Sequence, residues 1–396
     1  MNNQPIINIG CLGCVSDGKS TLIDKLTGIK TQKHSQEKVR NITIKQGYGN
    51  MKIWKDENDN KYHTTNSQYD NLNNLKLVNH ISFIDCPGHN DYIKTLLGAT
   101  SLMDGVIIVI AVDQPISNKQ QLLQHLFITK IHKINKIIIC LNKIDLVDKE
   151  VVLLRKKELD DLLVKYDITA HIIIPTCFNK MIGINNVINS IMDIFNPTYF
   201  IKNQNTNPLF RISRSFDINK PGTDWFNVNG GIIGGALING TLNINDEIEI
   251  RPGIINKNTW TPIKTKIISI KSDTLNLDKV ISGGLIALGT NIDPYYCKND
   301  MLCGNVVGLL DLLPQVYTNI NINTIIIDHD WLPEVNNLLH LQIGTSSFDG
   351  NIISINNNIF NIELFKPVCI TDNDNIIICF KINNNLKIVA QALLHL

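Results

Sequence analysis

One short segment near the N-terminus limits what this chain can fold into. The apolar run INIG leads into Gly13-Cys-Val-Ser-Asp-Gly18-Lys19-Ser20-Thr21, which matches the pattern G-x-x-x-x-G-K-[ST] at each fixed position. Glycines let the backbone N–H groups face phosphates, and a helix that begins at the lysine directs its positive end toward them. The alternative is a chance glycine-rich turn, but a strand pattern before the segment and a helix pattern after it favour phosphate binding. The residues expected to bind are Gly13, Ser16, Asp17, Gly18, Lys19, Ser20 and Thr21, with Ser20 also holding magnesium.

The pattern around this segment predicts the fold class. Up to about Asn196, short apolar runs alternate with helix-like stretches, which is typical of a doubly wound, mostly parallel sheet. Beyond Pro208, short Ile/Val-rich runs separated by glycines are typical of antiparallel β-barrels. We therefore predict a nucleotide-binding domain at 1–200, a β-barrel at 208–314 and a second β-barrel at 315–396. The Asn-rich stretch from Asp56 to Asn74 is predicted to be an insertion.

Composition excludes several classes of protein. The net charge is +1, so no strong overall field attracts nucleic acid or anionic lipid, and any such contact must come from local patches. The nine cysteines form no pattern typical of a disulfide framework. Neither a secretory signal nor a long uncharged apolar run is apparent, so we expect a cytoplasmic protein without a membrane partner.

A second motif follows the apolar run HISFID. It reads Asp85-Cys86-Pro87-Gly88-His89, which alone would be an ordinary turn but gains meaning downstream of a phosphate loop. Asp85 is placed to support magnesium, and Gly88 offers its amide to a γ-phosphate. His89 is a candidate for the catalytic residue that orients the attacking water, with a purely structural histidine as the alternative.

Between these motifs a switch segment must lie. Residues 40–45, RNITIK, occupy that place. Thr43 can offer its hydroxyl to magnesium and its amide to the γ-phosphate, so the segment would order with a triphosphate. By itself Ile-Thr-Ile is only a strand pattern, and its relative position supports the functional interpretation.

A third motif indicates which base is bound. Asn142-Lys143-Ile144-Asp145 ends the apolar run KIIICLN, at the carboxyl edge where such sheets bind ligands. Asp145 can accept two hydrogen bonds from the guanine N1 and N2 groups, and the aliphatic stem of Lys143 can cover the base. Adenine lacks that pair of donors and would leave the carboxylate unpaired. The motif therefore predicts GTP or GDP as the ligand.

Taken together, the chain resembles the gamma subunit of eukaryotic and archaeal translation initiation factor 2, a relative of elongation factor Tu. The resemblance spans nearly the whole chain, and its most specific passages are RNITIKQGYGN at 40–50, FRISRSFDINKPG at 210–222, GGIIGGALINGTLNINDEIEIRPGI at 230–254, GGLIALGTNIDP at 283–294 and KPVC at 366–369. It implies a GTP hydrolase that binds methionylated initiator tRNA and delivers it to the small ribosomal subunit. It also implies alpha and beta partner subunits, GTPase-activating and exchange factors, and magnesium as cofactor.

The resemblance also implies roles for individual residues. Tyr48 would lie near the tRNA acceptor end, with a core tyrosine of the following strand as the alternative. The family's Pro-Ile-Ser-Ala segment, whose backbone contacts the guanine carbonyl, is similar to Pro175-Thr-Cys-Phe-Asn179. Cys177, Phe178 and Asn179 are therefore expected in the guanine site.

Several departures from the family pattern alter these expectations. Cys14 and Asp17 replace two histidines of the family's phosphate loop, and Asp17 is expected to add negative charge beside the phosphates. The stretch 56–79 has no cysteine, so no zinc site is expected. The end of the last barrel offers only Lys381 and Lys387, which predicts weaker tRNA binding there than is usual for the family.

Two other functions remain open from the sequence. One is a GTP-binding scaffold of the initiation complex that does not hydrolyse its nucleotide, suggested by Cys14 and Asp17. The other is an elongation-type carrier of a special tRNA, against which the segment RSFDINKPG argues.

Overall fold

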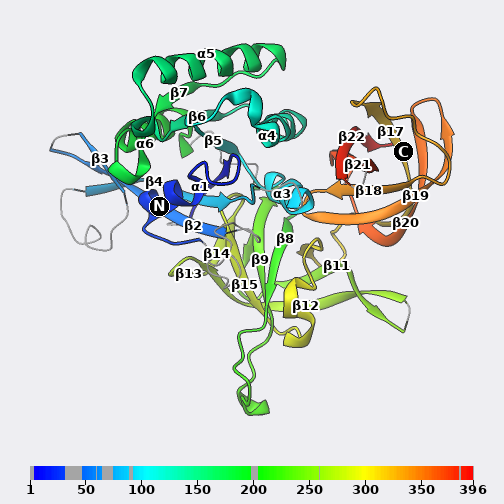
Figure 1. Ribbon diagram of the computed structural model, residues 1–396. Helices are drawn as coiled ribbons and strands as arrows, with labels where there is room; N and C mark the ends of the chain where they lie inside the picture. The colour runs from blue at the N-terminus through cyan, green and yellow to red at the C-terminus, as the bar shows by residue number, and fades with distance from the viewer. Residues whose placement is uncertain are drawn as a thin grey trace. The chain divides into compact units, whose positions relative to one another are not determined.

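The computed structural model describes residues 4–31, 47–58, 60–64, 75–88, 92–197, 204–257, 259–382 and 385–395. The chain forms two compact units, Asn3–Ile201 and Lys202–Leu396 (Figure 1). None of the helices in these described ranges has the length and apolarity needed to cross a membrane.

The first unit is built on a seven-stranded sheet in the order β3-β2-β4-β1-β5-β6-β7. The parallel strands are β4 (Leu75–Asp85), β1 (Ile7–Leu12), β5 (Gly105–Ala111), β6 (Ile137–Asn142) and β7 (Ile172–Pro175). Two antiparallel strands, β2 (Gly47–Asp56) and β3 (Tyr62–Thr64), extend one edge. The strand β3 lies within the stretch predicted as an insertion, where Tyr62 and Thr64 favour extended backbone and pair with β2.

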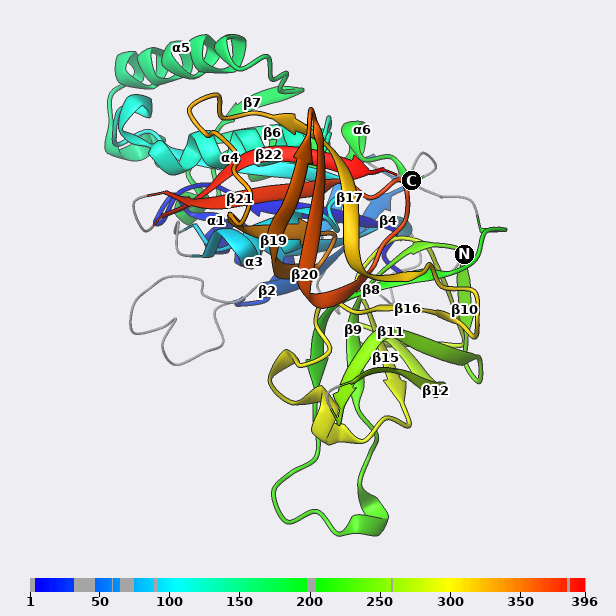
Figure 2. The same ribbon diagram turned by 90° about the vertical axis from the view of Figure 1, so that its right-hand side faces the viewer.

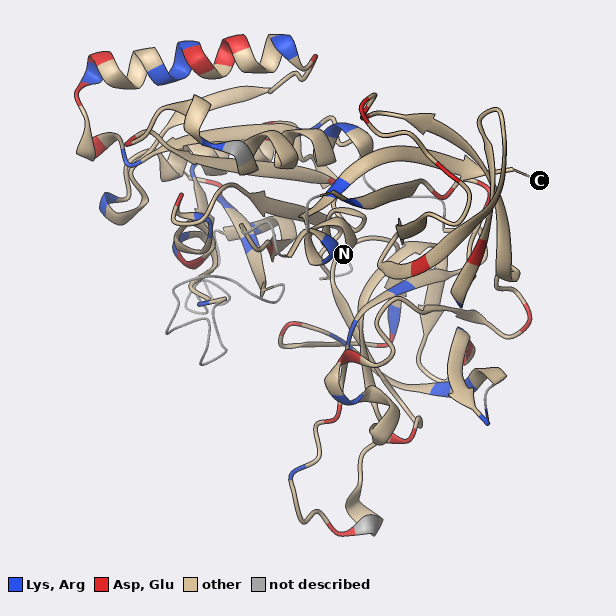
Figure 3. Ribbon diagram, turned by 45° about the vertical axis from the view of Figure 1, so that its right-hand side comes forward, with Lys and Arg blue, Asp and Glu red and all other residues tan. Residues whose placement is uncertain are grey.

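Helices cross between the parallel strands. They are α1 (Lys19–Thr27), α3 (Ile93–Thr100), α4 (Gln120–Ile131), α5 (Lys149–Lys165) and α6 (Ile184–Ile194), with short 3-10 turns η3 (Ile116–Asn118), η4 (Ile144–Leu146) and η5 (Phe178–Lys180). Along α5, both basic and acidic residues are present, as on a helix with a solvated face (Figure 3).

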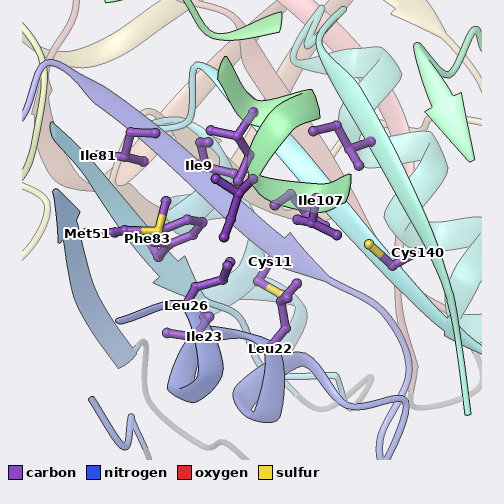
Figure 4. Close-up of a cluster of buried hydrophobic side chains, with 14 of the residues drawn as sticks. Ile9, Cys11, Leu22, Ile23, Leu26, Met51, Ile81, Phe83, Ile107 and Cys140 are labelled. Atoms are coloured by element: carbon purple, nitrogen blue, oxygen red, sulfur yellow. The ribbon is translucent and has the colours of Figure 1, made fainter. Parts of the chain in front are cut away.

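The core of this unit packs α1 and α6 against the sheet. Leu22, Ile23 and Leu26 of α1 contact a cluster that includes Phe83 of β4 (Figure 4). Burial of each such aliphatic side chain contributes about 1.5–3 kcal/mol. This packing anchors α1 behind the loop that precedes it, and so positions the phosphate loop.

The second unit contains two closed antiparallel barrels. The strands of the first ring are β8 (Leu209–Phe216), β9 (Ile232–Asn239), β15 (Ile286–Thr290), β12 (Thr259–Ser272), β11 (Glu247–Asn256) and β16 (Val306–Leu309). The pairing of β11 with β12 closes it. Short strands β10 (Thr241–Asn243), β13 (Leu275–Leu277) and β14 (Lys279–Ile281) accompany it, with a 3-10 segment η8 (Pro294–Asp300). The loop between β8 and β9 carries η7 (Trp225–Asn227) and projects from the barrel (Figure 2).

The second barrel closes in the order β17-β20-β19-β18-β21-β22. Its strands are β17 (Val316–Ile326), β18 (Leu338–Ile343), β19 (Ser346–Asn356), β20 (Ile359–Cys369), β21 (Ile376–Ile382) and β22 (Asn385–Leu394). Buried Trp331 packs near Phe360 and Phe380, at ring-centroid distances of 6.4 and 5.9 Å. A doubly wound sheet followed by two antiparallel barrels confirms the predicted fold class.

Candidate guanine-nucleotide site

A cavity of about 340 Å³ lies in the first unit, where β1 and β6 end and α1 begins. Residues from all three sequence motifs line it. They are Val15, Ser16, Gly18, Lys19, Ser20, Thr21, Gly88, Asn142, Lys143, Asp145, Leu146, Cys177, Phe178 and Asn179. Gly13, Asp17 and Asp85 are not among these lining residues, and Thr43 and His89 lie outside the described residues.

The phosphate loop turns sharply before α1. Gly18 has φ 109°, a left-handed conformation that glycine adopts without strain, and the helix begins at the next residue. Buried Lys19 donates from Nζ to the backbone oxygen of Cys14 at 2.7 Å. Gly88 lies close to this loop. A Cβ atom added at Gly88 would lie 2.7 Å from Nζ of Lys19 and 2.9 Å from N of Val15. The loop, the lysine and Gly88 therefore form one side of the cavity.

Oxygen atoms suited to magnesium meet beside this loop. The hydroxyl of Ser20 donates to Oδ2 of Asp85 at 2.7 Å, and the hydroxyl of Thr31 donates to the same oxygen. Asp85 is fully buried at the end of β4. Hydroxyl and carboxylate oxygens are ligands that Mg²⁺ prefers, so Ser20 and Asp85 fit that ion.

Asn142 joins the two halves of the cavity. Its Nδ2 donates to the backbone oxygen of Asp17 at 2.8 Å, and its Oδ1 accepts from the backbone N–H of Phe178 at 3.2 Å. The residue is only 5% exposed. Its side chain therefore ties the phosphate loop to the segment of η5, a role that the motif alone did not reveal.

The carboxylate of Asp145 faces the cavity with two polar neighbours. The thiol of Cys177 donates to Oδ1 at 3.1 Å, and Nζ of Lys180 lies 3.1 Å from Oδ2. The pKa of Asp145 is held below its ordinary value, chiefly by the hydrogen bond from Cys177 and next by Lys180. The group is therefore an ionised acceptor at neutral pH. Lys180 was not predicted from the sequence. The only indication of its role was its position three residues after Cys177.

The expectation that the carboxylate of Asp17 adds negative charge beside the phosphates is wrong. Its side chain is 2% exposed, and Oδ2 accepts from the backbone N–H of Cys14 at 2.8 Å. Its Oδ1 accepts from Nζ of Lys119 at 2.7 Å and from the backbone N–H of Ala111 at 3.2 Å. The carboxylate is thus paired with a cation behind the loop, because partners from β5 and from the residue before α4 are within reach there.

One more group behind the loop, His125, was not found from the sequence. The backbone N–H of Gly13 donates to Nδ1 of His125 at 3.1 Å. Burial, and secondarily the charge of Lys19, lower the pKa of His125 to about 3, so the imidazole stays neutral and accepts this bond. Burial raises the pKa of the Cys14 thiol to about 11, and the negative charge of Asp17 is the next cause. The thiol therefore stays protonated at neutral pH.

Tyr48 lies in β2, where it pairs with Ile84 of β4. Every second residue at the start of β2, from Gly47 to Ile53, is buried. Tyr48 lies between two of these buried residues and is itself half-buried. Its neighbours Gly47 and Gly49 are buried. Since successive side chains of a strand point to opposite faces, Tyr48 points away from the face that carries Met51 of the core cluster.

Comparison with known proteins agrees with this geometry. Residues 4–197 match the model of the elongation factor Tu GTP binding domain, and residues 332–393 match that of initiation factor eIF2 gamma, C terminal. Eukaryotic translation initiation factor 2 subunit gamma of Encephalitozoon cuniculi is 36% identical over 99% of this chain and 93% of its own length. Translation initiation factor 2 subunit gamma of Methanocaldococcus jannaschii is 37% identical over 98% of this chain and 97% of its own.

The chain belongs to the translation initiation factor 2 gamma family. It is accordingly a GTP-binding initiation factor and a translational GTPase. Solved structures show the same fold. A bacterial selenocysteine-specific elongation factor, EF-Sec, has a TM-score of 0.76 at 21% identity, over 98% of this chain and 58% of that one. Elongation factor SelB from Methanococcus maripaludis, in complex with the GTP analogue GppNHp, has a TM-score of 0.75 at 20% identity, over all of this chain and 80% of that one.

Proposed function

We propose that the chain binds GTP or GDP in this cavity, carries methionylated initiator tRNA in the GTP state, and delivers it to the small ribosomal subunit. The observation that carries the nucleotide assignment is the convergence of the phosphate loop, Gly88, and Asn142 to Asp145 on one cavity. The observation that carries the initiation assignment is the similarity to gamma subunits over nearly the whole chain.

On the phosphate side, the amides of the loop and Nζ of Lys19 bind the phosphates. Ser20 and Asp85 would hold magnesium, directly or through water, and Thr43, which lies outside the described residues, is the candidate third ligand. Magnesium, when bound, supplies positive charge that neutralises the phosphate oxygens. Gly88 lies close to Lys19 and is the candidate amide donor to the γ-phosphate. His89 follows it as the candidate residue that orients water for hydrolysis.

On the base side, Asp145 accepts hydrogen bonds from guanine, and the stem of Lys143 covers the ring. Lys143 has φ 64° and its Nζ lies 3.2 Å from Oδ2 of Asp113, so the ammonium is directed away while the stem stays at the cavity. The amide of Phe178 is already donated to Asn142, which leaves the adjacent Asn179 segment to contact the guanine carbonyl. Adenine is disfavoured because it lacks the two donors with which guanine would pair to this carboxylate.

The remaining assignments concern partners. We assign the chain as the gamma subunit of a cytoplasmic complex with alpha and beta subunits, served by GTPase-activating and exchange factors. Tyr48, half-buried on the face of β2 away from the core cluster, is the candidate contact for the tRNA acceptor end. The non-hydrolysing scaffold loses support because the charge of Asp17 is paired with Lys119. Elongation-type factors share the fold at 20–21% identity, against 36–37% for the gamma subunits.

Filter binding tests this function. Labelled methionylated initiator tRNA would be titrated with the reconstituted three-subunit complex in the presence of a non-hydrolysable GTP analogue and then GDP. We expect tighter binding with the analogue, and a preference for initiator over elongator methionyl-tRNA. Equal binding of both tRNAs would contradict the initiation role, and equal binding with both nucleotides would contradict the switch.

A further inference from the structure

Asp17 and Lys119 form a buried ion pair behind the phosphate loop. Their side chains are 2% and 7% exposed, and Nζ of Lys119 lies 2.7 Å from Oδ1 of Asp17. Lys119 precedes α4, so the pair joins the loop to a distant part of the chain. Buried charges persist in proteins when they are paired and hydrogen-bonded, and both conditions hold here.

The carboxylate of Asp17 also shapes the loop itself. Its Oδ2 accepts from the N–H of Cys14, and its Oδ1 from the N–H of Ala111 in β5. These bonds turn the start of the loop inward and leave the later residues, Val15, Ser16 and Gly18, to line the cavity. The loop is thus held from behind by a side chain that does not line the site.

The same residue connects the loop to the base-binding segment. Its backbone oxygen accepts from Nδ2 of Asn142, whose Oδ1 accepts from Phe178. The contacts therefore run without a break from Lys119 through Asp17 and Asn142 to η5. A displacement of Asp17 would disturb both the phosphate side and the base side of the cavity.

We propose that Asp17 and Lys119 are a positioning pair that holds the phosphate loop in its nucleotide-binding conformation, so that guanine-nucleotide affinity in this chain depends on their mutual neutralisation. The inference rests on the proposed nucleotide site. Removal of the lysine leaves an uncompensated carboxylate between the loop and β5, where it must either move toward water through the cavity or take up a proton.

The groups facing this carboxylate decide how it responds to pH. Lys119 from the segment before α4 pairs with it, and the thiol of Cys14 lies near it. Lys19 of α1 and the neutral imidazole of His125 in α4 bind the backbone of the adjacent residues Cys14 and Gly13. Without Lys119, Lys19 is the next cation that the described residues bring to this part of the loop, and its Nζ is donated to the backbone oxygen of Cys14. Burial then favours the protonated form of Asp17, so acid should neutralise it in place of the missing lysine.

The test compares dissociation constants for fluorescently labelled GDP, at pH 8 and pH 5.5, for the full chain and its variants. Lys119→Met should weaken binding at pH 8 by about tenfold or more, because an unpaired buried charge is strongly unfavourable. The difference from the wild type should shrink at pH 5.5. The double variant Asp17→Asn with Lys119→Met should lose less than the two single variants together, since coupled residues are not additive. Lys119→Arg keeps the charge, and exposed Lys157→Met on α5 is the matched control; both should bind like the wild type.

Denaturant unfolding of each variant without nucleotide gives its folded fraction, against which the binding data are corrected. A Lys119→Met variant that is fully folded and binds GDP as the wild type does at both pH values would overturn the proposal. The proposal would also be overturned if the losses of GDP affinity in Lys119→Met and Asp17→Asn add up in the double variant and do not change with pH. A wild-type chain that binds no GDP would instead overturn the proposed nucleotide site, and the inference with it. Asp17→Asn alone provides a second, independent comparison in case Lys119→Met does not fold.

Discussion

The side chain of Asn142 donates from Nδ2 to the backbone oxygen of Asp17 at 2.8 Å, across 125 positions of the chain. Its other end accepts from Phe178, so one buried amide holds the phosphate side and the base side at a set separation. A nucleotide that spans both sides needs that separation to be present before it binds, since ordering the two sides during binding would reduce the affinity.

Replacement of this amide should therefore weaken both sides at once. We expect Asn142→Ala to weaken GDP binding by about 1–3 kcal/mol, because it leaves a buried oxygen and a buried N–H without their partner. Isothermal titration calorimetry with GDP measures the effect. Asn185→Ala, at an exposed position of α6, is the control and should bind as the wild type does. Unchanged affinity in Asn142→Ala would show that the two sides are held by other contacts.

Base selectivity should depend on the carboxylate of Asp145. In Asp145→Asn one oxygen becomes an N–H donor, which opposes the guanine N1 and N2 donors but can pair with a carbonyl at that edge of xanthine. GDP should bind about tenfold or more weakly, while xanthosine diphosphate should gain affinity. Competition of both diphosphates, and of ADP, against labelled GDP measures the order. A variant that keeps the wild-type preference would place the base elsewhere.

The thiol of Cys177 should influence how binding depends on pH. Its hydrogen bond is the first cause that lowers the pKa of Asp145, with Lys180 next. Guanine binding needs the ionised carboxylate, so affinity is present above that pKa and is lost as the pH falls through it. Cys177→Ala should raise the pKa of Asp145 toward its ordinary value, so we expect its GDP affinity to decline at a higher pH than that of the wild type in a titration from about pH 6 to about pH 3.

A matched variant separates this hydrogen bond from packing. Cys177→Ser retains a donor at the same position, so its pH profile should stay near that of the wild type. Superimposable profiles for Cys177→Ala and the wild type would show that the thiol does not act on Asp145.

The C-terminal barrel should contribute little to phosphate contacts with tRNA. From residue 315 onward the chain has three lysines, no arginine and seven acidic residues. Figure 3 shows correspondingly few basic positions on these strands. Each phosphate neutralised on a duplex contributes about 0.9 to the slope of log K against log salt concentration. We expect Lys381→Gln with Lys387→Gln to lower the slope for initiator tRNA by less than about one. A decrease near two would show that both lysines contact phosphates.

Much of the architecture was predictable because its signals are local. Apolar runs that alternate with helix patterns predict a parallel sheet, and glycine-separated Ile/Val runs predict antiparallel barrels. The strand β3 was not predicted, because three residues in an Asn-rich stretch form a strand only through pairing with β2. Its existence depends on a neighbour and not on its own composition.

The sequence by itself determined which chemistry the chain can carry. The spacing of Gly18, Lys19 and Ser20 sets a turn followed by a helix, and Asp145 follows its strand closely, so neighbouring positions along the backbone already place these groups. The tertiary structure alone decided where Asp17 points. Its sequence suggested charge beside phosphate, yet Lys119, 102 positions away, and the N–H of Ala111 provide partners behind the loop. A buried carboxylate turns toward the cation and donors that the fold brings to it, and no pattern within the loop contains them.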